Sequence, residues 1–227
     1  GISIRTKLID DFVTSFLKKN PDGLIINLGC GLDSRFQRLN NGKITWLDMD
    51  LPEVIEMRKQ FFEESGRYRM AGASILDESW VEASKAYSGR TASVMILAEG
   101  TLMYFKEPEV KTFFNQAAAN FPDAELCFEV MGSARQDKVH PTVQCLGVDI
   151  TCPWGIDDYA ELEKWNAKLQ LIDSKSFIDY YPHRWGLFPR VLSRLFPRDK
   201  NRFGHSIVHM KIKTDLVTSN ITEKGTM

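Results

Sequence analysis

The chain has 227 residues, 43% of them hydrophobic and 26% charged, with a formal net charge of -1 at pH 7. These values are ordinary for a globular protein, and a chain of this length buries a sizeable core without disulfides or metal ions. The near-neutral charge gives no overall attraction to nucleic acids or anionic membranes, and no apolar run approaches the roughly 20 residues of a membrane-spanning helix, so we expect neither partner.

Short apolar segments alternate with amphipathic stretches up to residue 130, a pattern typical of a mostly parallel sheet with helices on both faces. Hydrophobic spacing predicts a first helix over residues 9–19. Strands are predicted over 24–28, 44–49, 69–73, 93–98 and 125–130, and helices over 52–62, 80–87 and 107–120.

Beyond residue 130 the pattern becomes less regular. Residues 131–155 show no clear period, and a helix is predicted over 156–167, followed by strands over 169–173 and 207–212. We interpret the chain as one domain over residues 1–227, with irregular cap or lid segments at about 131–155 and 180–204.

A basic segment, His183 to His205, precedes the last predicted strand and interleaves aromatic side chains with cations. It is either a solvated surface insertion or a lid that attracts an acidic, aromatic substrate, and an anionic surface is a third interpretation. Its cations are Arg184, Arg190, Arg194, Arg198, Lys200 and Arg202.

The cysteines form no Cys-x-x-Cys pair, and no histidine stands at zinc-finger spacing from them. His205 and His209 would lie about 13 Å apart on a strand, too far to share an ion. We therefore expect no metal site. We expect the cysteines to be free thiols in a reducing cytoplasm. They are Cys30, Cys127, Cys145 and Cys152.

A glycine turn follows the first predicted strand, in the segment LIINLGCGLDSR of residues 24–35. Gly29 allows a sharp turn, and Gly31 allows the backbone to approach a ligand, because no Cβ stands in the way. The dinucleotide-binding fingerprint has a third glycine where this chain has Ser34. The turn alone is therefore a weak signal for a nucleotide site.

The next predicted strand ends in ITWLDMD, which places Asp48 and Asp50 at distances from Gly29 that suit a ribose-binding carboxylate. Asp50 is nearer the end of the strand, and we expect it to bind the ribose. Sites for NAD and for S-adenosylmethionine (SAM) both contain such an acid. Ser34 and the absence of a Tyr-x-x-x-Lys pair favour SAM.

Four segments in this order, NLGCGLDSRFQRL, DMDLPEV, SILDESW and AEGTLMYF, resemble the leucine carboxyl methyltransferase family, and more closely its bacterial tetracenomycin-type polyketide O-methyltransferases. The resemblance covers residues 4–120 well. It implies a Rossmann-like, class I SAM-dependent methyltransferase, which is an α/β fold with a seven-stranded, mostly parallel sheet, an antiparallel last strand and helices on both faces.

The resemblance also implies which residues bind the methyl donor. Gly29 and Gly31 would lie against the methionine part of SAM, and Asp50 would hold the ribose. Arg5 matches a family arginine that pairs with the SAM carboxylate. Glu99 matches a family acid that faces the ammonium end of SAM.

The adenine side departs from the family pattern, because some relatives have an aspartate at the position of Ser74. Ser74 and Ile75 could still contact the adenine through backbone groups and a hydroxyl, and Asp77 is the nearest carboxylate. Relatives usually have more chain ahead of Arg5, including segments that cover the cofactor. The resemblance therefore does not establish whether a lid closes over the cofactor in this chain.

The function implied is methyl transfer from SAM to a carboxylate or hydroxyl of a small, polyketide-like molecule. A carboxylate is ionised at pH 7, whereas a hydroxyl acceptor needs a nearby base. His140 and His183 are candidate bases, although an ordinary surface histidine is the simpler interpretation of each, and Tyr104 is a candidate for orienting the substrate. The alternatives are methyl esterification of a protein C-terminus, a degenerate SAM-fold scaffold and an NAD-dependent oxidoreductase.

Overall fold

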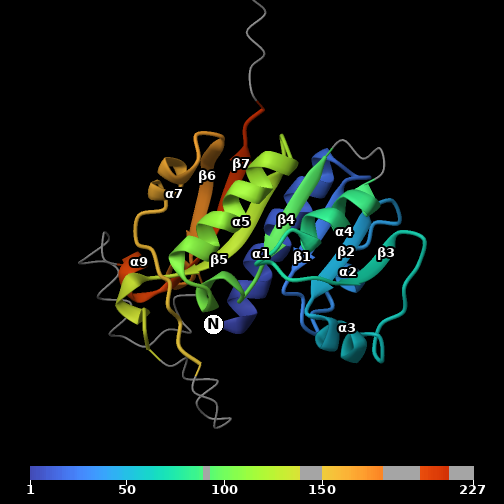
Figure 1. The fold of residues 1–227 in the computed structure, drawn as a ribbon, viewed down its shortest axis with the longest axis horizontal. Helices are drawn as coiled ribbons and strands as arrows, with labels where there is room; N and C mark the ends of the chain where they lie inside the picture. The colour runs from blue at the N-terminus through green and yellow to red at the C-terminus, as the bar shows by residue number, and fades with distance from the viewer. Residues whose placement is uncertain (89–92, 139–149, 181–199, 215–227) are drawn as a thin grey trace, which may run out of the picture.

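A computed structural model describes residues 1–88, 93–138, 150–180 and 200–214. Within these ranges seven strands form one sheet in the order β3-β2-β1-β4-β5-β7-β6. β7 runs antiparallel to both of its neighbours, and the other neighbouring strands are parallel. This arrangement, with helices on both faces of the sheet (Figure 1), confirms the predicted fold.

The strands are β1 (Leu24–Leu28), β2 (Thr45–Asp50), β3 (Tyr68–Gly72), β4 (Val94–Ala98), β5 (Glu125–Met131), β6 (Leu169–Ser176) and β7 (His205–Ile212). The α-helices are α1 (Ile2–Lys19), α2 (Arg35–Leu39), α3 (Pro52–Arg58), α4 (Ser79–Ser88), α5 (Glu107–Asn120), α7 (Glu161–Trp165) and α9 (Lys200–Phe203). Short 3-10 helices are η1 (Leu102–Tyr104), η2 (Ser133–Arg135) and η3 (Phe177–Asp179).

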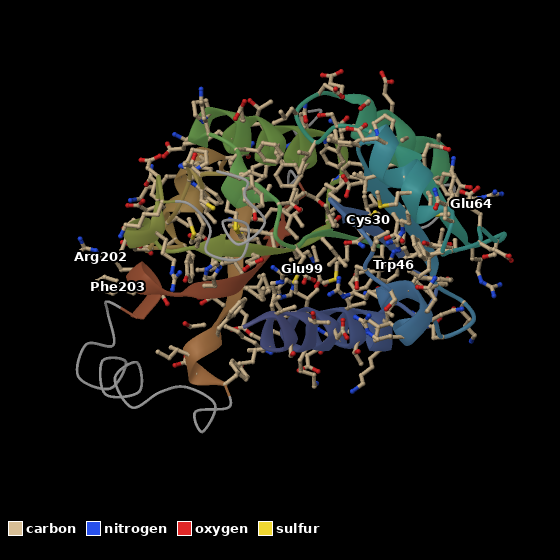
Figure 2. The ribbon with its side chains drawn as sticks, turned by 90° about the horizontal axis from the view of Figure 1, so that it is seen from below. Cys30, Trp46, Glu64, Glu99, Arg202 and Phe203 are labelled. Atoms are coloured by element: carbon tan, nitrogen blue, oxygen red, sulfur yellow. The ribbon has the colours of Figure 1, made fainter. Side chains whose placement is uncertain are left out.

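Successive side chains of each strand point to opposite faces of the sheet, which divides the core into two layers. In β1, Leu24, Ile26 and Leu28 join the layer that contains residues of α4 and α5, whereas Ile25 joins the layer that contains α1. Figure 2 shows α1 on one side of the sheet and α5 on the other. The whole of β1 is buried, as expected of a parallel strand covered on both faces.

The strand order reverses between β1 and β4, which are paired so that Leu28 lies opposite Ala98. Ligands of open α/β sheets bind beyond the carboxyl ends of the strands at such a point. The fold therefore brings the glycine turn after β1 next to Glu99, the residue that follows β4.

The first helix is longer than the hydrophobic spacing predicts. It was expected over residues 9–19 and begins at Ile2, and Ile4 and Leu8 continue its buried face. Arg5 lies between them and also turns toward the protein, where two carboxylates bind it. Because the charged Arg5 interrupts the apolar residues on the inner face, hydrophobic spacing does not detect the first turns of the helix.

The helix predicted over residues 156–167 is wrong in length, because α7 covers only Glu161–Trp165. The residues ahead of α7 instead contact the end of β5 and the core. Ile156 donates its backbone N–H to the carbonyl of Met131 over 2.8 Å, and its side chain is buried in the core. These contacts with distant residues, and not the helical spacing of the apolar side chains, determine the backbone conformation ahead of α7.

Several predictions concern residues outside the described ranges. They are the candidate bases His140 and His183, the cysteine Cys145, and most of the basic segment. The other three cysteines are buried free thiols, in agreement with the prediction.

A buried polar cluster centred on Asp48 and Arg58 supports the glycine turn that follows β1. Asp48 accepts hydrogen bonds from Asn27, Trp46 and Tyr68, each at 2.8 Å, and forms an ion pair with Arg58. The side chains of Asp48 and Arg58 are fully buried.

Arg58 also donates to two carbonyls of the turn, Gly31 at 2.8 Å and Asp33 at 2.6 Å. Asp48 is therefore a structural residue, and this leaves Asp50 as the acid of β2 that can reach a ligand.

We predict that Asp48→Asn lowers the free energy of unfolding by about 3–5 kcal/mol, because it leaves the Arg58 guanidinium buried without its carboxylate. Urea denaturation measures the change. The control is Glu56→Gln on the exposed side of α3, where an exposed ion pair with Lys59 is lost and a change below about 1 kcal/mol is expected. Equal losses in the two variants would contradict the prediction.

Candidate functional site

The two glycines of the turn after β1 have different roles. Both have left-handed backbones, with φ of 64° at Gly29 and 48° at Gly31. A Cβ on Gly29 would lie 2.2 Å from the hydroxyl oxygen of Thr101, so this glycine permits close packing against the chain after β4. A Cβ on Gly31 would meet no heavy atom within 4 Å. Gly31 therefore borders open space at the carboxyl edge of the sheet.

Asp50 faces the same turn from the end of β2. Its Oδ2 accepts a hydrogen bond from the backbone N–H of Gly31, and its Oδ1 accepts one from Leu51, both at 2.8 Å. A carboxylate has about four acceptor positions, so two remain for a further pair of donors. The carboxylate is thus held in a fixed orientation beside the open space at Gly31.

A network of buried and partly buried charges surrounds Glu99, the residue that follows β4. Arg5 of α1 binds Glu99 at 2.6 Å, and Arg35 of α2 binds it at 2.5 Å. Arg35 is 1% exposed and also pairs with Asp10 and Asp33, both at 2.7 Å. Figure 2 shows Glu99 on the side of the sheet that α1 covers. The network thereby joins two helices to the carboxyl edge of the sheet.

Glu129, near the end of β5, belongs to the same network and was not identified from the sequence. It is 2% exposed and accepts hydrogen bonds from Arg5 at 3.1 Å and from the backbone N–H of Gly100 at 2.9 Å. His205 of β7 binds its other oxygen at 2.9 Å. Glu129 is an acid between apolar residues near the carboxyl end of its strand, and an acid at the end of a strand is the signal that identified Glu99.

The electrostatic balance of this network favours a cationic ligand. Four carboxylates face three guanidinium groups, so the cluster carries a net negative charge. Burial alone lowers the pKa of the Arg35 guanidinium, but Asp33, Glu99 and Asp10 together hold that pKa above its ordinary value. Arg35 therefore stays charged. The members are Asp10, Asp33, Glu99, Glu129, Arg5, Arg35 and Arg38.

SAM fits this set of residues. It combines a sulfonium, an ammonium and a carboxylate, so its net charge is positive and opposite to that of the cluster. Arg5 has Nε on Glu99 and Nη1 on Glu129, an orientation that holds the guanidinium beside Gly100.

The residues predicted to contact the adenine follow β3. Ile75 is buried in the core layer of α4 and α5. The hydroxyl of Ser74 accepts a hydrogen bond from the N–H of Leu76 at 3.1 Å. Asp77 is exposed and accepts a bond from the N–H of Ser79, whose side-chain hydrogen bond lowers the pKa of the Asp77 carboxyl. Asp77 thus supports the start of α4, and its contact with adenine stays a prediction.

A small separate apolar cluster lies where η1 and the end of β5 meet. It contains Met103, Met131 and Cys152, with Tyr104 packed against it. Burial, Cys152 and Glu129 raise the pKa of the Tyr104 phenol, so Tyr104 keeps its proton and can donate a hydrogen bond. This suits the expected role of Tyr104 in orienting a substrate.

The described residues contain no group of three or more His, Cys, Asp and Glu side chains arranged to hold a metal ion. Over the same ranges, no helix combines the length and the apolar character that crossing a membrane requires.

Comparison with known proteins adds independent findings. The family model described as leucine carboxyl methyltransferase matches residues 1–118. The tetracenomycin polyketide synthesis O-methyltransferase TcmP of Streptomyces glaucescens is 27% identical over 218 residues, covering 91% of this chain and 76% of TcmP. The SAM-dependent methyltransferase dpfgK of Gibberella zeae is 30% identical over 178 residues, covering 71% of this chain and 58% of dpfgK.

A solved structure shares the fold at low sequence identity. Magnesium protoporphyrin IX methyltransferase from Synechocystis PCC 6803, with S-adenosylhomocysteine (SAH) bound, superimposes with a TM-score of 0.53 and 11% identity. The match covers 92% of this chain and 84% of that one.

The two glycines provide a matched test of the site. Both Gly29→Ala and Gly31→Ala place a Cβ on a left-handed backbone, which costs about 1–2 kcal/mol. We predict a larger loss of stability for Gly29→Ala because of the Thr101 clash. For Gly31→Ala we predict an affinity for SAH at least about tenfold weaker, since its Cβ occupies ligand space.

Calorimetric titration with SAH and thermal unfolding measure the two effects. Wild-type affinity in Gly31→Ala would place the ligand elsewhere.

Proposed function

Since this chain belongs to the leucine carboxyl methyltransferase family and is a SAM-dependent methyltransferase, we propose that it transfers the methyl group of SAM to an oxygen atom of a small molecule. The similarity to TcmP carries this proposal, because that relative is an O-methyltransferase and the match extends over 91% of the chain. The same similarity supports a polyketide-like acceptor, and the free cysteines agree with an enzyme of the cytoplasm.

The residues at the carboxyl edge of the sheet would bind and orient the donor. Asp50 would accept hydrogen bonds from the ribose, and Gly31 would leave room for the methionine part. Arg5 would pair with the carboxylate of SAM and Glu99 with its ammonium group. SAM itself supplies, when bound, a methyl group made electrophilic by the sulfonium.

On the adenine side, Ser74, Ile75 and Asp77 are the proposed contacts. They follow β3, the strand next to β2, so they lie beyond the ribose-binding carboxylate of Asp50 in the order of the sheet.

The acceptor must present an oxygen lone pair in line with the bond that breaks, in a site from which water is excluded. A carboxylate is already ionised at pH 7 and can attack the methyl group directly, whereas a hydroxyl must also lose a proton. Tyr104, whose raised pKa keeps its phenol protonated, would donate a hydrogen bond to the acceptor. The basic residues between His183 and His205 favour an acidic, aromatic molecule.

A second candidate is methyl esterification of a protein C-terminal carboxylate, which the description of the family favours. The two differ in the size of the acceptor. Both use an oxygen nucleophile, so the donor-binding residues would serve either one. The scaffold alternative predicts donor binding without turnover of any acceptor.

Three acceptor probes test the proposal: a hydroxynaphthoate, a naphthoate and a naphthol. With SAM carrying a deuterated methyl group, mass spectrometry reads whether a methyl ether or a methyl ester forms. We expect a labelled product from at least the hydroxynaphthoate, and about a tenfold or greater loss of turnover in Glu99→Gln, because Glu99 anchors Arg5.

The matched control is Glu56→Gln, which changes an exposed carboxylate of α3 and should turn over at the wild-type rate. SAM binding with no labelled small molecule, together with label on a protein C-terminus in a cell extract, would favour the second candidate. Binding without label on either would favour the scaffold.

A further inference from the structure

We propose that Arg35 is a positioning residue for the methionine end of the donor: it holds the Glu99 carboxylate from the buried side, so that the ammonium group of SAM meets a fixed oxygen. The inference rests on the proposed role of Glu99 in donor binding and adds the residue that orients it. The sequence analysis assigned no role to Arg35. Arg35 acts through Glu99, and its own contact with SAM is not required.

Each nitrogen of the Arg35 guanidinium binds a different carboxylate. Nε donates to Asp10 at 2.7 Å, Nη1 to Asp33 at 2.7 Å and Nη2 to Glu99 at 2.5 Å. The Arg35 side chain is 1% exposed. A guanidinium is a rigid planar fork of donors, so it fixes three acceptors in set directions, which the ammonium of a lysine does not.

The three carboxylates belong to the segments that carry the methionine side of the proposed donor site. Asp10 lies on α1, the helix that also carries Arg5. Asp33 follows Gly31 in the turn after β1, and Glu99 follows β4. One guanidinium therefore holds together every segment that is expected to contact the amino-acid group of SAM.

Glu99 has a different arginine on each of its oxygens. Oε2 binds Arg35, which is 1% exposed, whereas Oε1 binds Nε of Arg5, which is 27% exposed. The Glu99 side chain is itself 13% exposed. Oε1 thus lies on the more open side of the ion-pair network, where a ligand can reach it, and Arg35 holds the oxygen on the buried side.

The ion pair between Arg5 and Glu99 matches the charged groups that SAM brings. In the structure the two side chains bind each other at 2.6 Å. When the donor binds, its carboxylate pairs with Arg5 and its ammonium with Glu99, so each side chain exchanges a protein partner for a ligand group. Arg5 keeps Glu129 in this exchange, and Glu99 keeps Arg35.

This exchange explains why Glu99 needs a second arginine. Without Arg35, the partly buried carboxylate of Glu99 would have Arg5 as its cationic partner, and the carboxylate of SAM would compete for the same guanidinium. With Arg35 in place, Glu99 stays paired while Arg5 turns to the ligand. The orientation of Glu99 is then the same before and after the donor binds.

Arg38 offers a matched comparison one turn further along α2. It binds Asp10 at 3.2 Å and Asp33 at 3.4 Å, which are two of the carboxylates that Arg35 binds. Over the described residues, Glu99 is not among the partners of Arg38. The same substitution at the two arginines therefore isolates the contact with Glu99.

The test compares the affinities of SAH and methylthioadenosine in Arg35→Lys and Arg38→Lys by calorimetric titration. Methylthioadenosine has the adenosine and the thioether of SAH and lacks the amino-acid group. Lysine keeps the charge and removes the fork. We expect Arg35→Lys to bind SAH about tenfold or more weakly and methylthioadenosine within about threefold of wild type. In Arg38→Lys any change should be the same for both compounds.

A double-mutant cycle with Glu99→Gln shows whether Arg35 acts through Glu99. We expect Glu99→Gln alone to weaken SAH binding by about tenfold or more. Adding Arg35→Lys to that variant should weaken it by less than about threefold further, because the contact through which Arg35 acts is already altered. An independent structural role of Arg35 predicts instead that the two losses multiply.

NMR of the arginine side chains tests the exchange in the wild type, so the proposal is decided even if Arg35→Lys fails to fold. On addition of SAH, the Nε–H signal of Arg5 should shift, because its partner Glu99 takes the ammonium group. The two Nη2 hydrogens of Arg35 should stay distinct, because the ion pair with Glu99 hinders rotation about the Cζ–Nη2 bond.

Equal losses of affinity for SAH and methylthioadenosine in Arg35→Lys would overturn the proposal, as would SAH binding within about threefold of wild type. Losses that multiply in the double variant would also overturn it, and so would averaging of the Arg35 Nη2 signals when SAH binds. Wild-type SAH affinity in Glu99→Gln would overturn the proposed role of Glu99, and this inference with it. A loss in Glu99→Gln without a loss in Arg35→Lys would refute the role of Arg35 alone.

Discussion

The carboxyl edge of the sheet depends on the partly buried Glu99, which two arginines bind. Arg5 comes from α1 and is partly exposed, whereas Arg35 comes from α2 and is 1% exposed, so Arg35 would be costly to bury without its carboxylates. The ion pairs therefore specify how these helices sit against β4. Because Asp10 and Asp33 share Arg35, the position of α1 and the shape of the glycine turn are set by the same group.

Glu129 connects this network to the last strand of the sheet. It shares Arg5 with Glu99, binds the N–H of Gly100, and holds His205 through its second oxygen. A single buried carboxylate thus contacts groups from α1, the chain after β4, and β7.

Similar residues that lie close together in the sequence have different surroundings at this edge. Asp48 is enclosed by Arg58, Tyr68 and other donors, whereas Asp50 keeps acceptor positions toward the open space at Gly31. Gly29 permits packing, and Gly31 leaves room for a ligand. In each pair one residue is enclosed by neighbouring groups and supports the turn, and the other borders the open space beside it.

The sequence by itself determined the alternation of strands and helices, the glycine turn, and the acids at the ends of β2 and β4, because each depends on local spacing. Only the tertiary structure decided the partners of Arg5, the role of Asp48, the length of α7 and the place of Glu129 and His205. These depend on contacts between residues far apart in the chain. Local patterns do not record such contacts, since burial of a charge is set by the partner that another element supplies.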